Sequence, residues 1–443
     1  MAYKSGRPTL RKTKMDGWYE FYREACPICG KVDQCVIHED NNRVWCLRVA
    51  SDIVWGKNST MQGWLHFLNE DNRTFTASDF ANADTGSHQE KKSDGHLNRV
   101  YRALLSEMEL RPEHRAMLKK PDRDMNEEEL RIRQYRSFPE KPYEVVRKVV
   151  ERVGNVEDLI GVPGFYSKEG KYGRYFTISG FPSTIMIPFR NHKNEIVGFQ
   201  WRVDEVKNQV VYSSRPDKEL EAYVVKQPNF VVAKYKGIEV FRGSMELKEK
   251  KDIKLSDGRY VGTIKLDKGQ RYMWFSSANK ESGTGAGPLP IHVSVPSRVL
   301  KNWKVGQLLK TDTVVVTEGP IKSDKSAELL DQMLQTAEER LSYGTTVLSV
   351  PGVNSWRLLC PYFEEMGVKN INFAFDMDAE ENPDVRRYYH DAINFFSEAG
   401  YNVSFFIWDR SYKGLDDLLI RNFLPIKYNI HGEQMLSDNK DVY

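Results

Sequence analysis

The last third of the sequence alternates between short β-branched or aromatic segments and amphipathic segments, and this alternation restricts the fold more than any other feature. The strand-like segments are 313–316, 346–350, 371–375 and 403–407. Apolar residues recur between them at helical spacing, at Ala327, Leu330, Leu334, Ala337 and Leu341 and again at Val385, Tyr388, Tyr389, Ala392, Phe395 and Phe396. Strands that alternate with helices predict a parallel sheet with helices on both faces, and therefore an α/β fold.

Acidic residues follow several of these predicted strands. Asp376 and Asp378 come after the third strand, and an extended chain places both on one side. Glu318 follows the first strand, and Asp416 and Asp417 follow the last. Parallel sheets place their chemistry beyond the carboxyl ends of their strands. Carboxylates this close repel unless a cation relieves them, and Mg²⁺ prefers such oxygen ligands. The alternative is that these acids only favour the first turn of a helix.

Three separated elements in this region resemble the Toprim domain, which is shared by bacterial-type primases, topoisomerases and some nucleases. They are an E-G pair at 318–319, D-x-D at 376–378 and K-G-x-D-D at 413–417. The resemblance covers about residues 311–424. It implies a C-terminal Toprim domain that uses Mg²⁺ or Mn²⁺ for phosphoryl transfer. The implied ligands and catalytic acids are Glu318, Asp376 and Asp378, with Asp416 as a further magnesium ligand.

The same region is also similar to a domain family of uncharacterised function found in mobile-element primases and replication proteins. The segments 317–324, 375–383 and 413–419 carry this similarity. Lys322 lies in the turn after the first of the acids. We expect it to pair with a phosphate group, or otherwise to be a solvated lysine at the start of a helix.

Four of the five cysteines lie within the first 46 residues. Tetrahedral Zn²⁺ takes four nitrogen or sulfur ligands, and so short a segment lacks a core unless something such as a metal holds it together. We predict a structural zinc site on Cys26, Cys29, Cys35 and Cys46, with His38 competing with Cys35 for the last position. Residues 1–70 then form a zinc ribbon, including a closing strand at 63–68.

Residues 4–14 of this module carry five Lys or Arg residues and predict a mobile basic arm, which either touches phosphates or is only a solubilising tail. The ribbon resembles those at the front of primase-like proteins of phages, plasmids and integrative elements. That resemblance implies contact with template DNA through Trp45, Arg48 and Trp64. The alternative is that these aromatic residues form the small core of the ribbon.

Composition limits the remaining possibilities. The chain has 443 residues of which 40% are apolar, so we expect two to four domains with substantial cores. It carries 65 basic and 62 acidic residues, which excludes a uniformly basic coat but allows local basic patches. The sequence has neither the hydrophobic core of a signal peptide nor a long apolar run, so we expect a soluble cytoplasmic protein with reduced cysteines.

The middle of the chain divides into three parts. Residues 71–96 are polar and predict a linker. Residues 97–160 predict a helical region, with helices at 127–133 and 142–153, which either grips DNA or serves as a spacer. Residues 161–310 predict a β-rich α+β subdomain. Its glycine-rich run at 283–287 is a phosphate cradle or, as we prefer, a flexible loop.

The β-rich subdomain resembles the amino-terminal half of the polymerase core of DnaG-type primases. Strands at 184–189 and 196–203 carry an I-P-x-R-(turn)-I-x-G-F-x-x-R hairpin, and a basic-Tyr-x-x-S-S-type segment follows much later. The resemblance implies that Arg202, Arg271 and Tyr272 face the template or the incoming triphosphate. Residues 204–269 separate the two elements and predict an inserted β element, with strands at 230–233, 238–241 and 260–266.

Together these features predict a DNA primase-like enzyme of a mobile genetic element that makes primers on single-stranded DNA from nucleoside triphosphates. The reaction is expected to be Mg²⁺-dependent nucleotidyl transfer. The sequence contains no Walker-type helicase motif, so we expect a separate helicase to unwind the DNA. Two alternatives use the same features: a Toprim-type metal-dependent nuclease, and a non-catalytic replication initiator that binds DNA.

Overall fold

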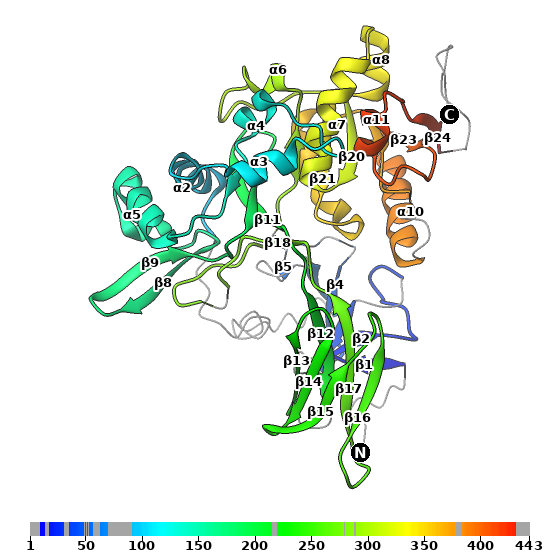
Figure 1. Ribbon diagram of the computed structural model, residues 1–443. Coiled ribbons are helices and arrows are strands. Elements are labelled where there is room, and N and C mark those ends of the chain that lie inside the picture. The colour runs from blue at the N-terminus through cyan, green and yellow to red at the C-terminus, as the bar shows by residue number, and fades with distance from the viewer. Residues whose placement is uncertain are drawn as a thin grey trace. The chain divides into compact units, whose positions relative to one another are not determined.

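The chain, described here from a computed structural model, is a mixed α/β protein, as the sequence predicted (Figure 1). The structure describes residues 9–13, 17–30, 35–47, 49, 51, 53–55, 63–69, 91–214, 219–278, 280–287, 289–377 and 383–430. It forms two compact units, of which the first is Met1–Pro182, Met186–Gln200 and Trp274–Tyr443 and the second is Ser183–Ile185 and Trp201–Met273. None of the helices in the described ranges has the length and apolar character needed to cross a membrane.

The N-terminal module of the first unit is a six-stranded antiparallel sheet with the order β1-β2-β3-β4-β6-β5. Its strands are β1 Leu10–Lys12, β2 Trp18–Phe21, β3 Val36–His38, β4 Arg43–Cys46, β5 Ile53–Trp55 and β6 Gly63–Phe67. The expectation of a mobile arm was wrong for β1, because Leu10 pairs with Phe21 and is buried in the module's core. Residues 4–8 and Lys14 lie outside the described residues.

Helices follow the segment that was predicted as a linker, of which residues 71–90 lie outside the described residues. They are α2 Asp94–Ser106, α3 Pro112–Leu118, α4 Glu127–Arg133 and α5 Pro142–Val153. The last two have the predicted bounds. Proline at the first position of α3 and α5 suits a helix start, since its missing N–H has no partner there in any case. The sequence analysis did not identify α3.

The next segment begins with a hairpin of β8 Phe165–Gly170 and β9 Gly173–Ile178, which the sequence analysis did not predict. The predicted strands follow as β10 Thr184–Arg190 and β11 Ile196–Val203. They form a four-stranded sheet with β7 Arg136–Ser137 and β18 Tyr272–Trp274, in the order β18-β11-β10-β7.

The second unit contains the predicted inserted β element. Two three-stranded antiparallel sheets, β12-β17-β16 and β13-β14-β15, share one apolar core. Their strands are β12 Asn208–Ser214, β13 Leu220–Lys226, β14 Phe230–Tyr235, β15 Ile238–Ser244, β16 Lys250–Lys254 and β17 Tyr260–Lys268. The amide of Val203 donates to the carbonyl of Arg271 at 2.8 Å, so the two ends of this segment lie side by side.

The C-terminal part of the first unit is a six-stranded sheet with the order β19-β21-β20-β22-β23-β24. Its strands are β19 His292–Ser294, β20 Thr313–Glu318, β21 Thr346–Val350, β22 Asn370–Phe373, β23 Asn402–Ile407 and β24 Ile426–Asn429. The four predicted strands are parallel to one another. The sheet as a whole is mixed, because β19 and β24 add antiparallel edges that the sequence analysis did not foresee.

Helices cover both faces of this sheet, as Figure 1 shows for α7 and α10. The helical segments are α6 Ser297–Leu300, α7 Pro320–Met333, α8 Ala337–Tyr343, η3 Val353–Leu359, α9 Cys360–Met366, α10 Pro383–Glu398 and α11 Leu415–Ile420. Successive residues of β20 pack into two different apolar cores, one on each face of the sheet. Val314 and Val316 pack with α9 and α10, and Val315 packs with α7 and α11.

The first predicted helix of this region is in fact two helices. The apolar stripe was expected to be continuous from Ala327 to Leu341, but α7 ends at Met333 and α8 begins at Ala337. Thr336 and Glu339 form a capping box at the start of α8, and this local alternative to a continuing helix explains the break. Leu341 is consequently exposed rather than part of the core.

Candidate functional site

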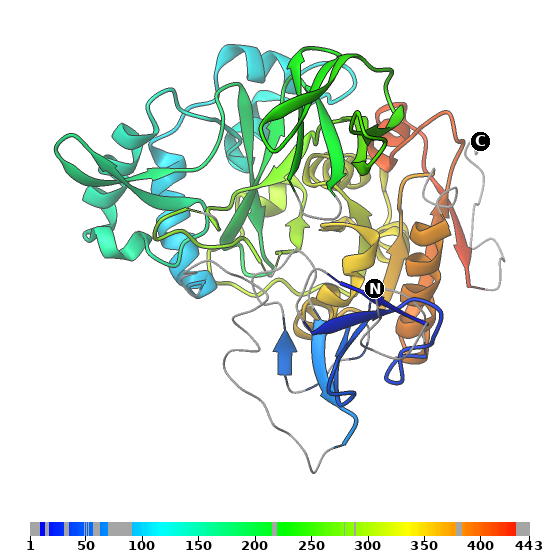
Figure 2. The same cartoon turned by 90° about the horizontal axis from the view of Figure 1, so that it is seen from below.

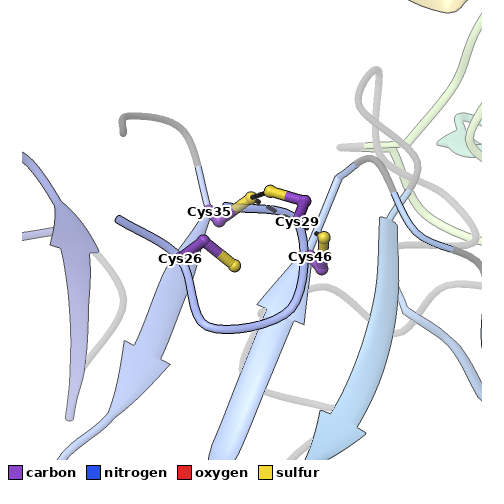
Figure 3. Close-up of side chains that lie close together, drawn as sticks. All are labelled: Cys26, Cys29, Cys35 and Cys46. Carbon is purple, nitrogen blue, oxygen red and sulfur yellow. Dashed lines mark hydrogen bonds between the residues drawn. The ribbon is translucent and has the colours of Figure 1, made fainter. Parts of the chain in front are cut away.

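The four predicted zinc ligands converge in the N-terminal module (Figure 3). One Sγ atom from each of Cys26, Cys29, Cys35 and Cys46 lies within 4.8 Å of the others. The Cys29–Cys35 and Cys35–Cys46 Sγ distances are 3.7 and 3.8 Å. Tetrahedral thiolates about 2.3 Å from zinc stand about 3.8 Å from one another. The cluster therefore has the ligand set and the size of a structural zinc site.

The knuckle geometry explains how two of these ligands reach the site. Gly30 adopts a left-handed conformation, with φ of 68°, and its amide donates to the carbonyl of Cys26 at 2.8 Å. The pKa of the Cys26 thiol is raised, mainly by its interaction with the neighbouring thiol of Cys29. Cys26 and Cys35 are both fully buried, and a bound zinc ion would take the four cysteines as thiolates by displacing their protons.

His38 does not join the cysteine cluster. Its ring nitrogen Nδ1 lies 2.8 Å from Nη2 of Arg43 and 3.1 Å from a carboxylate oxygen of Asp40. Trp45 packs against the small apolar cluster of the ribbon, as expected for a core residue. Arg48, the predicted DNA contact, lies outside the described residues.

The predicted acidic site lies at the carboxyl ends of the parallel strands, where Lys322 and Asp376 form its central ion pair. Lys322 is in the first turn of α7, and Asp376 follows β22. The ammonium group of Lys322 lies 2.5 and 2.6 Å from the two carboxylate oxygens of Asp376. Lys413 adds a second positive charge 4.0 Å from Asp376. A cation therefore already faces this carboxylate, and it belongs to the chain itself.

Asp416, in the first turn of α11, is the buried member of the site. Its Oδ2 accepts a hydrogen bond from Arg123 at 3.2 Å, but no group among the described residues donates to its Oδ1. Burial, and next the charge of Asp417, raises the pKa of Asp416 to about 6. A Cβ atom on Gly414 would lie 2.5 Å from Oδ1 of Asp416 and 3.2 Å from Nζ of Lys322. Only glycine therefore fits in this position of the K-G-x-D-D element.

Arg123 is a site residue that the sequence analysis missed. It lies between α3 and α4, in the region predicted as a spacer or DNA grip, and 293 positions before its partner Asp416. Lys325 of α7 supports the same segment, because its ammonium group donates to the carbonyl of Asp124. Sequence spacing carries no signal for so distant a contact.

Glu318 is the last residue of β20. Its Oε1 accepts a hydrogen bond from the amide of Val353 at 2.8 Å, at the start of η3. Asp378 lies outside the described residues. Within the described part of the chain, the only set of three or more candidate metal ligands close enough to share an ion is the cysteine cluster.

Behind the acidic edge, α7 contributes to a second, fully buried ionic network. Asp324 accepts hydrogen bonds from Arg133 at 2.6 Å, Tyr135 at 2.5 Å and Ser294 at 2.9 Å, and His292 lies 3.1 Å away. Burial alone would raise the pKa of Asp324, but Arg133 and then His292 outweigh it and hold the pKa below its usual range. This network ties α4 and β19 to α7 and so positions the helix that carries Lys322.

The predicted phosphate-binding residues Arg202, Arg271 and Tyr272 all belong to the second unit. The hydrogen bond between Val203 and Arg271 brings the two arginine-bearing segments together despite the insertion. Arg202 is mostly buried, with its guanidinium 4.0 Å from Asp204. Arg271 and Tyr272 are exposed.

One family model matches part of the chain, and several solved structures are similar to the chain. The family model is described as a domain of unknown function (DUF3854) and matches residues 334–423. This range includes Asp376 and Asp416 but not Glu318 or Lys322. No curated protein matches the chain.

The similar solved structures are catalytic or zinc-binding domains of primases. The Aquifex aeolicus primase, with its zinc-binding and RNA polymerase domains, aligns with a TM-score of 0.40 and 13% identity, covering 94% of this chain and 77% of that chain. A DNA primase domain from Pseudomonas aeruginosa aligns with a TM-score of 0.40 and 13% identity over 74% of each chain. The RNA polymerase domain of the Mycobacterium tuberculosis primase DnaG gives 0.39 and 13%, with coverages of 74% and 82%.

Proposed function

We propose that this chain is a primase-type nucleotidyltransferase of a mobile genetic element, which synthesises primers on single-stranded DNA. In this proposal residues 311–443 are a Toprim domain, residues 161–310 are the other half of the catalytic core, and residues 1–70 are a zinc ribbon. The observation that carries the proposal is the meeting of Lys322, Asp376 and Asp416 beyond the carboxyl ends of parallel strands.

The residues at this edge fit a magnesium ion provided that Lys322 leaves Asp376. Asp376 offers carboxylate oxygens, and Oδ1 of Asp416 is a buried oxygen that lacks a hydrogen-bond donor among the described residues. Such oxygen donors suit Mg²⁺ or Mn²⁺. Glu318 and Asp378 are the further ligands that the Toprim resemblance implies. The ion would supply compensation for the negative charge that develops on the triphosphate during transfer.

The chain's own groups would bind and orient the reactants. In the reaction the primer 3′-hydroxyl attacks the α-phosphate, a new P–O bond forms, and pyrophosphate leaves. The hydroxyl proton needs an acceptor, and the carboxylate of Glu318 is the candidate, unless it serves as a metal ligand instead. Lys322, once released from Asp376, can pair with a phosphate of the triphosphate. Arg202, Arg271 and Tyr272 would hold the template or the triphosphate.

The proposed partners are single-stranded DNA, nucleoside triphosphates and a separate helicase, and the proposed location is the cytoplasm. The zinc cluster would keep the N-terminal module folded so that it can hold template DNA. Zinc thiolate sites of this kind hold together modules too small to have a sufficient core.

Primer synthesis is the direct test. Purified protein would be incubated with single-stranded DNA, Mg²⁺ or Mn²⁺ and labelled ribonucleotides or deoxyribonucleotides, in parallel with the Asp376→Ala/Asp378→Ala variant. Short labelled products from the wild type alone would support the proposal. Metal-dependent shortening of the DNA without nucleotides would replace it with a Toprim-type nuclease.

One observation favours a non-catalytic replication initiator as the second candidate. Lys322 neutralises Asp376 through both of its oxygens, as it would if the acidic edge needed no metal ion. An initiator would bind DNA tightly but neither extend nor cut it, with or without divalent cations. That result in the assay above would overturn the enzymatic proposal.

A further inference from the structure

The β8–β9 hairpin has an exposed end that combines aromatic and basic side chains. All eight residues from 168 to 175 are exposed, and they include three basic residues and one acidic residue. The end of the hairpin points away from the neighbouring helices α2 and α5 in both views (Figure 1 and Figure 2). None of the residues with a proposed catalytic or phosphate-binding role lies in this hairpin.

One face of the hairpin is occupied by the loop that contains the glycine-rich run. The amide of Ser167 donates to the carbonyl of Glu281 at 2.9 Å, and Arg174 lies 3.0 Å from the carboxylate of Glu281. Arg174 also donates to Ser167 at 2.8 Å. Gly283 packs so tightly that a Cβ there would lie 1.9 Å from the carbonyl oxygen of Ser277. The loop thus contacts the hairpin through Glu281, and Gly283 is required by the packing of the loop itself.

The opposite face carries tyrosine and lysine side chains in register. Lys168 is directly across from Tyr175, and Tyr166 is two residues along on the same face. The ammonium groups of Lys168 and Lys280 lie 5.6 and 5.8 Å from the ring centroid of Tyr166. Two cations therefore lie near the ring of Tyr166, which is itself buried.

The ring of Tyr175 packs against Gly170. A Cβ atom on Gly170 would lie 2.9 Å from Cε1 of Tyr175, so any larger residue there would displace the ring. Tyr175 is nevertheless 41% exposed, which leaves part of its ring open to a ligand. At the turn, Tyr172 is 93% exposed, with Lys171 5.4 Å from its ring centroid. Neither ring contributes to a core.

We propose that this tyrosine–lysine face, formed by Lys168, Lys171, Tyr172, Tyr175 and Lys280 around the buried Tyr166, binds single-stranded DNA. Exposed rings stack on unpaired bases, whose faces are accessible only in a single strand, and adjacent ammonium groups neutralise the phosphates between those bases. The predominance of basic over acidic residues at the end of the hairpin matches such a ligand. The proposal rests on the proposed function only in taking template DNA as the partner.

The test measures binding separately from catalysis. The full-length Asp376→Ala protein would be titrated into a fluorescently labelled single-stranded oligothymidylate without nucleotides or divalent cations, and anisotropy would report Kd. Adding Tyr172→Ala and Tyr175→Ala should weaken binding about tenfold, because each stacked base contributes strongly. Adding Lys168→Ala and Lys171→Ala should reduce the slope of log Kd against log salt by about 1.4.

Two matched substitutions control for general effects. Tyr143 on α5 is 51% exposed, and Lys369 is an exposed lysine paired with Asp312. Tyr143→Ala and Lys369→Ala should leave Kd and its salt dependence unchanged. Unchanged binding in the two hairpin double variants, with circular dichroism equal to that of the parent protein, would overturn the proposal.

A labelled duplex of the same sequence distinguishes stacking from simple charge attraction. The tyrosine substitutions should not affect duplex binding, and an equal loss on duplex and single strand would overturn the assignment to unpaired bases. The inference and the proposed function can fail separately. Hairpin-dependent binding without primer synthesis would remove the enzymatic proposal alone, and primer synthesis without hairpin-dependent binding would remove only this inference.

Discussion

Two buried carboxylates, Asp324 in α7 and Asp416 in α11, lie in different environments, and the contrast separates a paired structural network from the proposed site. Asp324 lies within α7, and both of its oxygens accept hydrogen bonds from buried partners. Asp416 is buried to the same degree near Lys322, but only one of its oxygens is paired among the described residues. Burying an unpaired carboxylate oxygen is costly, and this distinguishes Asp416 from the fully paired Asp324.

Charge also differs between these two regions. The pKa of Asp324 is lowered and that of Asp416 is raised to about 6, because burial is outweighed by Arg133 and His292 in the first case and reinforced by Asp417 in the second. Asp324 therefore stays ionised within its network at neutral pH. At the acidic edge, burial and the charge of Asp417 make the ionised form of Asp416 less favourable.

The largest expected effect is on catalysis at the acidic edge. Asp376→Ala should lower primer synthesis by about a thousandfold or more, since it removes a proposed ligand of the ion that would offset the negative charge of the transition state. The temperature of thermal unfolding should stay within about 2 °C of the wild type, because a partly exposed ion pair contributes little to stability. An inactive variant that had also lost its circular dichroism signal would not distinguish the two regions.

The next effect is on stability and arises in the buried network. Arg133→Ala leaves Asp324 charged and buried without its main partner, and should lower the free energy of unfolding by about 3–5 kcal/mol. Arg298 provides a control. It pairs with Asp331, which lies in α7 like Asp324, but Arg298 itself is largely exposed. Arg298→Ala should cost at most about 1 kcal/mol. Similar losses in the two variants, measured by urea unfolding, would contradict the proposed contrast.

A smaller effect concerns acid sensitivity. Because the pKa of Asp324 is lower in the folded than in the unfolded state, the folded state binds fewer protons, and stability is lost as pH falls through the ordinary carboxyl range near about 4. The stability difference between wild type and Asp324→Asn should therefore shrink below about pH 5, by up to about 1.4 kcal/mol per pH unit. A difference that stays constant from pH 7 to pH 4 would assign the acid response to other groups.

The smallest effect tests whether Lys322 stands in for a metal ion. Lys322→Ala should tighten Mn²⁺ binding about two- to fivefold in the absence of nucleotide, because the ion no longer has to break the pair with Asp376. Mn²⁺ affinity is read by titration with electron paramagnetic resonance. Lys369→Ala, which removes a lysine–aspartate pair at the opposite end of β22, should leave it unchanged. Weaker binding in Lys322→Ala would show that the lysine assists the metal instead.

The comparison also shows what the sequence could and could not reveal. The strands that carry the acids and the four cysteines were predictable, because periodicity and ligand spacing are local signals. The antiparallel edge strands β19 and β24 were missed because the direction of a strand depends on its neighbours in the sheet. The break after α7 was missed because it depends on the capping residues Thr336 and Glu339. Arg123 and the Asp324 network were invisible to sequence patterns because they join segments far apart in the chain.

The hairpin of β8 and β9 was missed for a different reason. Its exposed end alternates aromatic with charged and glycine residues, and so lacks the regular apolar periodicity that marks a half-buried strand. The tyrosine and lysine residues of this segment support the proposed contact with single-stranded DNA.

The paired ends of the second unit have a consequence for protein engineering. Because the amide of Val203 donates to the carbonyl of Arg271, the chain leaves for the inserted sheets and returns at the same place. A deletion that replaced residues 204–269 by a tight turn would therefore preserve the register of the strands on either side. The inserted sheets can thus be removed or exchanged as one piece.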